Sequence, residues 1–167
     1  INAAGSFSGS VAAMAGAELP VAVRSQHMNV TEPTRIFITH LIQHAGKRLT
    51  LKQAANGSVI VGGGLVAQLD PTSGHVSVLR DSISKNLGTA MGVVPSLGQL
   101  DIIRVWAKQA IITDGIPILG EHPAVPGFYN AVPASSGYTT GPVCAYLLTN
   151  LLLGHLSAND LRAFSVE

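Results

Sequence analysis

The C-terminal third of the chain most strongly constrains the fold, because turn residues separate two short apolar segments and a helix there. Residues 116–119 and 128–132 are apolar and fit buried strands, and residues 113–115 before them form a turn sequence. A run of small residues over 135–142 then opens an apolar helix expected over 139–154. This order predicts a strand, a turn, a second strand and a helix with a glycine-rich start, where backbone N–H groups lack partners within the helix.

The rest of the chain predicts more strands than helices. Apolar and β-branched residues favour strands over 21–32, 49–53, 58–61 and 101–110. The Asn56-Gly57 pair is typical of the turn of a β-hairpin. Residues 5–16 and 78–93 fit helices, and residues 36–41 fit either a strand or an irregular segment. The predicted class is α+β, with a mixed, largely antiparallel sheet and flanking helices.

The surface of this chain is poor in charge. Charged residues make up 11% of the 167 residues, where about 25% is usual. We therefore expect a partner chain, self-association, a further segment or a bound ligand to cover part of the surface. The last helix is apolar nearly all round, which predicts that it is buried. The net charge of +1 and the scattered cations give no indication of nucleic-acid binding.

Several classes of site and location are disfavoured. The single cysteine, Cys144, excludes an internal disulfide and favours a reducing compartment, so we expect a cytoplasmic protein. The apolar stretch over 143–153 is shorter than the roughly 20 residues of a membrane span. The histidines show no metal-ligand spacing, and no metal site is expected. A serine nucleophile in a G-x-S-x-G turn is also missing from the sequence.

Residues 62–67 read Gly-Gly-Gly-Leu-Val-Ala and formally match the dinucleotide-binding pattern G-x-G-x-x-A. That pattern requires a helix of several turns after the glycines. Here Pro-Thr-Ser-Gly over 71–74 interrupts any helix after about six residues. The interpretation favoured by the sequence is a glycine turn at the end of a strand.

Three cations, Arg24, Arg104 and Lys108, are candidates for binding a substrate carboxylate. Each can equally be a surface charge. Arg24 and Arg104 are of more interest because both lie in apolar predicted strands, where a charge requires a partner.

A set of short motifs occurs in a fixed order along the chain. They read NAAGSFS from residue 2, RSQ from 24, SVIVGG from 58, RVWA from 104, TDGIPILG from 113, VPGFY from 125 and GYT from 137. In this order they resemble the FAD-dependent D-amino-acid oxidase family, and in particular glycine oxidase and the β subunit of sarcosine oxidase. The resemblance covers residues 1 to about 154.

The resemblance implies a fold in two parts. One part binds FAD and is built from separated segments, here residues 1–18 and 111–167. The other is an antiparallel sheet that carries the substrate, here residues 19–110. The implied activity is oxidation of the CH–NH bond of an amine or amino acid of the sarcosine, glycine, proline or opine type. The alternative is a non-catalytic fragment or subunit that serves assembly.

The same resemblance assigns site residues. Those near the cofactor are Asn2, Ala3, Ala4, Gly5, Gly115, Gly137, Tyr138 and Thr139. Those around the substrate are Arg24, Gln26, Arg104 and Tyr138.

Three departures from the family pattern qualify these assignments. The phosphate-binding G-x-G-x-x-G of the family belongs to a segment preceding the matched part, so FAD binding is expected only together with that segment. The Arg of the family's Gly-Leu-Arg-Pro is replaced, because residues 108–111 read Lys-Gln-Ala-Ile. The two His residues expected before the last helix are also missing. A secondary amine or opine thus becomes a plausible substrate.

Overall fold

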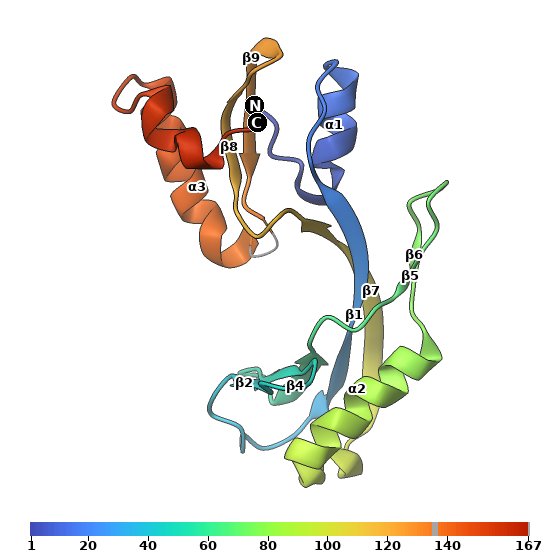
Figure 1. Ribbon diagram of the computed structural model, residues 1–167. Coiled ribbons are helices and arrows are strands. Elements are labelled where there is room, and N and C mark those ends of the chain that lie inside the picture. Colours follow the sequence, from blue (N-terminus) through green and yellow to red (C-terminus); the bar gives the residue numbers. More distant parts are fainter. Residues whose placement is uncertain (135–136, 167) are drawn as a thin grey trace. The chain divides into compact units, whose positions relative to one another are not determined.

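The computed structural model describes residues 1–134 and 137–166, and its chain forms two compact units (Figure 1). We call Ile1–Arg24 together with the chain from Ala110 onward the terminal unit, and Ser25–Gln109 the central unit. The chain passes between them within strand β1 (Ala22–Pro33) and within strand β7 (Ile102–Ile112). Each unit has its own buried residues and is described by itself.

The central unit contains a five-stranded sheet in the order β2-β3-β4-β1-β7. Its shorter strands are β2 (Ile42–Gln43), β3 (Thr50–Gln53) and β4 (Ser58–Gly62). The pairs β2–β3, β3–β4 and β1–β4 are all antiparallel. Gly57 in the β3–β4 turn has a φ of 90°, and a Cβ there would lie 2.3 Å from the Thr34 carbonyl oxygen, so the turn requires glycine. The predicted hairpin and the predicted α+β class are confirmed.

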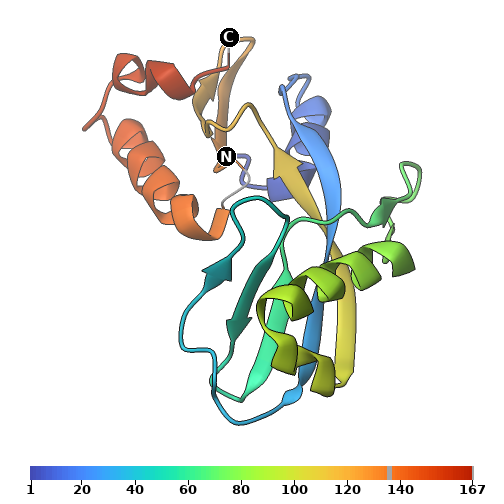
Figure 2. The same ribbon diagram turned by 60° about the horizontal axis from the view of Figure 1, so that its bottom comes forward.

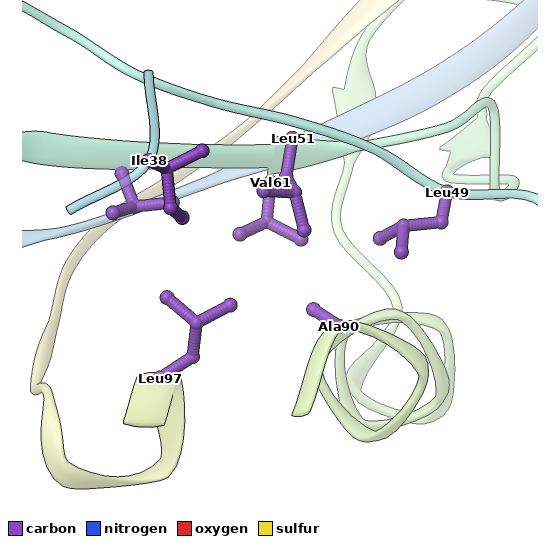
Figure 3. Packing of buried hydrophobic residues seen from close by; sticks show 7 residues of the cluster. Ile38, Leu49, Leu51, Val61, Ala90 and Leu97 are labelled. Carbon is purple, nitrogen blue, oxygen red and sulfur yellow. The ribbon is translucent and has the colours of Figure 1, made fainter. Parts of the chain in front are cut away.

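One helix and one 3-10 helix cover a face of this sheet (Figure 2). They are α2 (Arg80–Val93) and η2 (Pro95–Gln99), and the break between them precedes Pro95, where the sequence predicts a helix end. Figure 3 shows the side chains of the sheet strands and of the adjoining residues 38 and 49 facing those of α2 and η2. The buried cluster consists of Ile38, Leu49, Leu51, Val59, Val61, Ala90 and Leu97. A small hairpin, β5 (Gln68–Leu69) and β6 (Val76–Ser77), connects β4 to α2.

Strand β1 buries polar side chains. Its odd-numbered residues Ser25, His27, Asn29 and Thr31 are at most 5% exposed, while the alternate residues are partly exposed. Asn29 Nδ2 donates to Asn86 Oδ1 of α2 at 2.9 Å, and the Val59 amide donates to Thr31 Oγ1 at 2.9 Å. At Asn29 and Thr31, hydrogen bonds therefore replace apolar contacts and offset part of the cost of burying polar groups.

The terminal unit combines a two-stranded sheet with helices. Its elements are η1 (Gly5–Phe7), α1 (Ser8–Met14), β8 (Ile118–His122), β9 (Val125–Val132), α3 (Gly137–Leu152) and η3 (Ala158–Phe164). β8 and β9 pair antiparallel. The buried residues Ile111, Ile118 and Val132 form a small core with Leu19, Val21 and Val166.

The prediction that the last helix is buried is wrong for the described residues. Among the side chains of α3, Cys144 and Leu148 are buried, whereas Val143 is 52% and Tyr146 67% exposed. The reason is that α3 packs on β8 and β9 along one side only. The sequence pattern gives the helix its apolar character, but the described residues cover only one of its faces.

Two further findings concern the described residues as a set. None of their helices has the length and apolar character needed to cross a bilayer. Nor do three or more of their His, Cys, Asp and Glu side chains cluster closely enough to hold a metal ion.

Candidate functional site

The start of α3 is an open backbone segment among the predicted cofactor-binding residues. Thr140 Oγ1 donates to the Pro133 carbonyl oxygen at 2.8 Å, which ties the first helical turn to the end of the preceding sheet. Tyr138 is fully exposed, and Thr139 is exposed as well. A Cβ at Gly141 would meet no atom within 4 Å, and one at Gly137 only Pro133 Cγ at 3.5 Å.

This helix start has the properties of a site for a flat, electron-rich group. Small residues let such a group approach the backbone, and the N–H groups of a first helical turn carry partial positive charge. Residues 135 and 136, part of the predicted glycine-rich run, lie outside the described residues. The predicted residues Gly137, Tyr138 and Thr139 are brought together within one turn.

The predicted N-terminal cofactor residues differ in their exposure to solvent. Asn2 is 1% exposed, and its Nδ2 donates to the Ser8 carbonyl at 3.0 Å and to Asn130 Oδ1 at 3.3 Å. Its main chain adds bonds to Tyr129 at 2.7 Å and to Ala131 at 2.9 Å, so this asparagine fastens the N-terminal segment to β9. The Asn2 side chain is thus engaged within the protein.

The three residues after Asn2 are more accessible. Ala3 is exposed and Ala4 is half-buried. Gly5 has a φ of 57°, and nothing lies within 4 Å of the position of a Cβ. Gly5 therefore presents open backbone.

The turn that contains Gly115 is closed by its own side chains. Thr113 Oγ1 accepts from the Gly115 amide at 3.2 Å and donates to the Ile116 carbonyl at 2.8 Å. Asp114 Oδ1 accepts from the Ile116 amide at 2.9 Å. Asp114 thus caps its own turn, and the Gly115 N–H is already used.

The predicted substrate residues fall into different environments. Arg24 is half-buried, and its buried Nε has no hydrogen-bond partner within the described residues. Gln26 lies two residues further on the same face of β1 and is half-buried. Arg104 on β7 is exposed. The sequence argument that Arg104 requires a partner is therefore wrong, since water solvates its charge.

Cys144 lies on the packed side of α3, 3% exposed. Burial raises the pKa of its thiol, which keeps the sulfur neutral. A neutral, buried thiol suits a packing role rather than a nucleophile.

Sequence reasoning missed a group of cations in the central unit. His44, Lys47 and Arg48 lie between β2 and β3, and they line one cavity together with Gln26 and Lys108. The signal available in the sequence is a Lys-Arg pair directly after Gly46. Only the fold shows that Lys108, sixty residues later in the chain, lines the same cavity.

Comparisons with known proteins bear on the whole chain. The family model described as DAO, FAD dependent oxidoreductase, matches residues 1–151. No curated protein sequence matches the chain.

Solved structures share its fold. Glycine oxidase from Geobacillus kaustophilus superimposes with a TM-score of 0.80 at 19% identity, covering 99% of this chain and 44% of that enzyme. L-proline dehydrogenase from P. horikoshii superimposes with a TM-score of 0.84 at 20% identity, covering 98% of this chain and 44% of that enzyme. Iminodiacetate oxidase from Chelativorans sp. BNC1 superimposes with a TM-score of 0.80 at 19% identity, covering 97% of this chain and 44% of that enzyme.

These likenesses establish the fold, and the chain spans less than half the length of each of the three structures. The family model matches most of the chain. The chain belongs to the DAO family of FAD-dependent oxidoreductases.

Proposed function

We propose that this chain is part of an FAD-dependent oxidoreductase that oxidises the CH–NH bond of an amine or amino acid. The observation that carries the proposal is the family match over residues 1–151, which includes the open, glycine-rich start of α3. The enzyme is proposed to act in a reducing compartment such as the cytoplasm, in keeping with the free thiol of Cys144.

The two units are proposed to have different roles, cofactor binding and substrate binding. In this scheme the terminal unit, expected from the sequence as residues 1–18 and 111–167, contributes to FAD binding. The central unit, expected as residues 19–110, carries the substrate on its sheet. The small core and the exposed α3 of the terminal unit support this division, because such a unit has apolar surface left for further contacts.

The residues present at the start of α3 fit a flavin ring. Gly137 and Gly141 leave the backbone accessible, and the first-turn N–H groups favour negative charge on the group they face. We assign Gly137, Tyr138 and Thr139 to the ring edge and Gly5 to the remaining part of the cofactor. When bound, the flavin supplies the two-electron hydride acceptor. The tasks of this chain are to orient the substrate and to exclude water.

The diphosphate of FAD is proposed to be held outside these 167 residues. β4 ends at Gly62, and Gly63 and Gly64 have φ values of 131° and 77°. The chain then enters strand β5 rather than a helix. These glycines therefore lack the helix start that a dinucleotide requires. For this reason we expect the chain alone to be inactive.

The substrate is proposed to be a small amine or amino acid of the glycine, sarcosine, proline or opine type. Glycine oxidase, L-proline dehydrogenase and iminodiacetate oxidase, which share this fold, act by name on small compounds of this kind. The amine is bound in its neutral form, because only then is its nitrogen lone pair available to assist loss of hydride. We assign Arg24, Gln26, Arg104 and Tyr138 to the surroundings of the substrate.

The test is the flavin content of the full-length protein. Gly137→Val places a branched side chain at the start of α3, and we expect it to abolish flavin binding, measured as the ratio of flavin to protein absorbance. Gly88→Val is the matched control, because Gly88 lies in α2 with open space around it. Equal flavin content in both variants would contradict the assignment.

The second candidate is a non-catalytic subunit that serves assembly. It is favoured by the exposed apolar side chains of α3, among them Val143, Tyr146 and Leu152. The two candidates differ in a simple property of the purified full-length protein. A yellow protein that an amine bleaches supports the enzyme, whereas a colourless, tightly associated protein supports the assembly role.

A further inference from the structure

One cavity of the central unit collects positive charge. It has a volume of about 470 Å³ and opens to solvent, and β1, the β2–β3 connection, the glycine turn after β4 and β7 all contribute to it. We call it the basic pocket. The residues used in the argument are Gln26, His44, Lys47, Arg48, Gly64 and Lys108.

The charges of the basic pocket have one sign. Three of the ten Lys and Arg residues of the chain line the basic pocket, and no acidic residue that the structure describes lines it. Within the described part of the chain, Lys47, Arg48 and Lys108 form no ion pair. Cations gathered without an acidic partner repel one another and attract anions.

Neutral donors add to this character. His44 Nδ1 accepts a hydrogen bond from the Gly46 amide at 3.0 Å, which leaves the proton of the neutral ring on Nε2 as a donor. The Gln26 amide supplies N–H donors as well. Arg48 Nη1 donates to the Gly64 carbonyl at 3.3 Å, so its remaining N–H groups are available to a ligand.

The backbone of the pocket is fixed from two sides. A Cβ on Gly63 would lie 2.5 Å from the Arg48 carbonyl carbon, so the glycine turn packs directly on the β2–β3 connection. Asn86 Nδ2 of α2 donates to the Arg48 carbonyl oxygen at 3.5 Å from the buried side. The cations thus project from a supported backbone, which lowers the entropic cost of binding.

Two further cavities of the described residues lack this concentration of positive charge. The cavity beside the Thr113–Ile116 turn in the terminal unit is lined by both Asp114 and Arg162. The cavity between α2 and η2 is lined mainly by apolar residues such as Leu87 and Leu97. Among these cavities, the basic pocket alone selects for negative charge.

We propose that the basic pocket binds carboxylate groups of the substrate, and that the substrate is an amine with at least two carboxylates. The inference rests on the proposed function only in taking the ligand to be the substrate. A substrate with a single carboxylate would leave two of the three cations without a counter-charge, whereas a dicarboxylate allows Arg48 to pair in bidentate fashion and a lysine to take the second group.

The first experiment measures anion binding to the full-length protein by titration calorimetry, independently of any reaction. Succinate is expected to bind, and its neutral diamide is not. Arg48→Gln and Lys108→Gln should each weaken succinate binding about tenfold, which corresponds to about 1.4 kcal/mol, because each variant loses a charge-assisted hydrogen bond. The matched control is Lys52→Gln, an exposed lysine of β3 that does not line the pocket, and it should bind normally.

Three results would overturn the proposal. The first is equal binding of succinate and its diamide. The second is a loss of succinate affinity in Lys52→Gln equal to that in Arg48→Gln and Lys108→Gln. The third is inorganic phosphate binding more tightly than succinate, since it would assign the pocket to a phosphate group instead. Because two separate cations are replaced one at a time, a folding defect in one variant leaves the other as the test.

The second experiment measures flavin reduction in the full-length protein. The kcat/KM for an amine with two carboxylates should exceed that for its monoamide, and Arg48→Gln should raise KM for the dicarboxylate selectively. Equal kcat/KM for the two amines overturns the assignment of the pocket to the substrate. Retained succinate binding without flavin reduction by any amine instead contradicts the proposed oxidoreductase function and leaves the anion site standing.

Discussion

Helices α2 and α3 bury opposite kinds of side chain. α2 belongs to the central unit and buries Ser82, Asn86 and Ala90, which are small or polar. α3 belongs to the terminal unit, is strongly apolar, and leaves most of its large side chains exposed. The comparison teaches that the surface a helix meets decides which of its residues are buried, and that hydrophobicity alone does not.

The difference follows from what each helix packs against. α2 lies on a face of β1 that carries polar side chains, so an asparagine at its centre can form a hydrogen bond there. α3 meets the narrow two-stranded sheet of β8 and β9, which buries the Cys144–Leu148 side of the helix and no more. A two-stranded sheet is too narrow to cover a helix that is apolar nearly all round.

The largest effect is expected from replacing the asparagine of α2. Asn86→Leu removes the bond to the Gly62 carbonyl at 2.8 Å and leaves the buried Asn29 amide without its Asn86 partner. We expect the free energy of unfolding to fall by about 2–3 kcal/mol. Urea denaturation followed by the fluorescence of Trp106 measures it. Lys85→Leu on the exposed side of α2 is the control, and a similar loss in both variants would contradict the role of the hydrogen bonds.

The polar face of β1 also marks the limit of what the sequence could predict. The Asn56-Gly57 hairpin, the helix end before Pro95 and the α+β class follow from local turn chemistry and apolar patterning, and they are confirmed. In β1, however, Met28 and Val30 lie on the partly exposed face, and the alternate polar residues are buried. Apolar periodicity does not predict this, because the stabilising hydrogen bonds come from residues distant in sequence.

The candidate site divides in the same way. The open start of α3 and the closed Thr113–Ile116 turn follow from their own residue types, since glycine, threonine and aspartate act locally. The exposure of Arg104 and the joining of Lys108 with Arg48 in one cavity depend on tertiary contacts instead. Local turn and helix-start structure can be predicted from a single sequence, whereas the residues that line one pocket can be identified only from the fold.

A smaller effect is expected from the buried histidine of the polar face. His27 is 1% exposed and neither ring nitrogen has a hydrogen-bond partner among the described side chains. Burial lowers its pKa below the ordinary 6.5, partly offset by the neighbouring backbone of Val66 and Leu65. As pH falls through 6.5, the unfolded chain therefore takes up a proton before the folded protein does, and stability is lost until the folded pKa is passed.

This loss is limited to about 1.4 kcal/mol per pH unit for a single group. Urea midpoints at pH 7.5 and 5.5 measure it, and His27→Leu should reduce the difference relative to the unaltered protein. Contributions that do not involve His27 are common to both proteins and cancel in the comparison. An unchanged difference between the two pH values in His27→Leu would show that this histidine is not the source. Below about pH 4 the lowered pKa values of Asp70 and Asp160 add their own dependence, so the measurement stays above that range.

The smallest effect on folding is expected on the exposed side of α3. Val143 and Tyr146 are 52% and 67% exposed, so replacing both with glutamine, a good helix former, should change the free energy of unfolding by no more than about 0.5 kcal/mol. Leu148→Gln on the packed side should cost several times more, because it places an amide in an apolar contact. Sedimentation velocity of the same variants then tests what the exposed face does. If the double variant unfolds normally but self-associates less, the exposed apolar residues of α3 serve contact with another surface. If it instead unfolds as easily as Leu148→Gln, that face is already covered in the folded protein. The contrast between α2 and α3 would then be wrong.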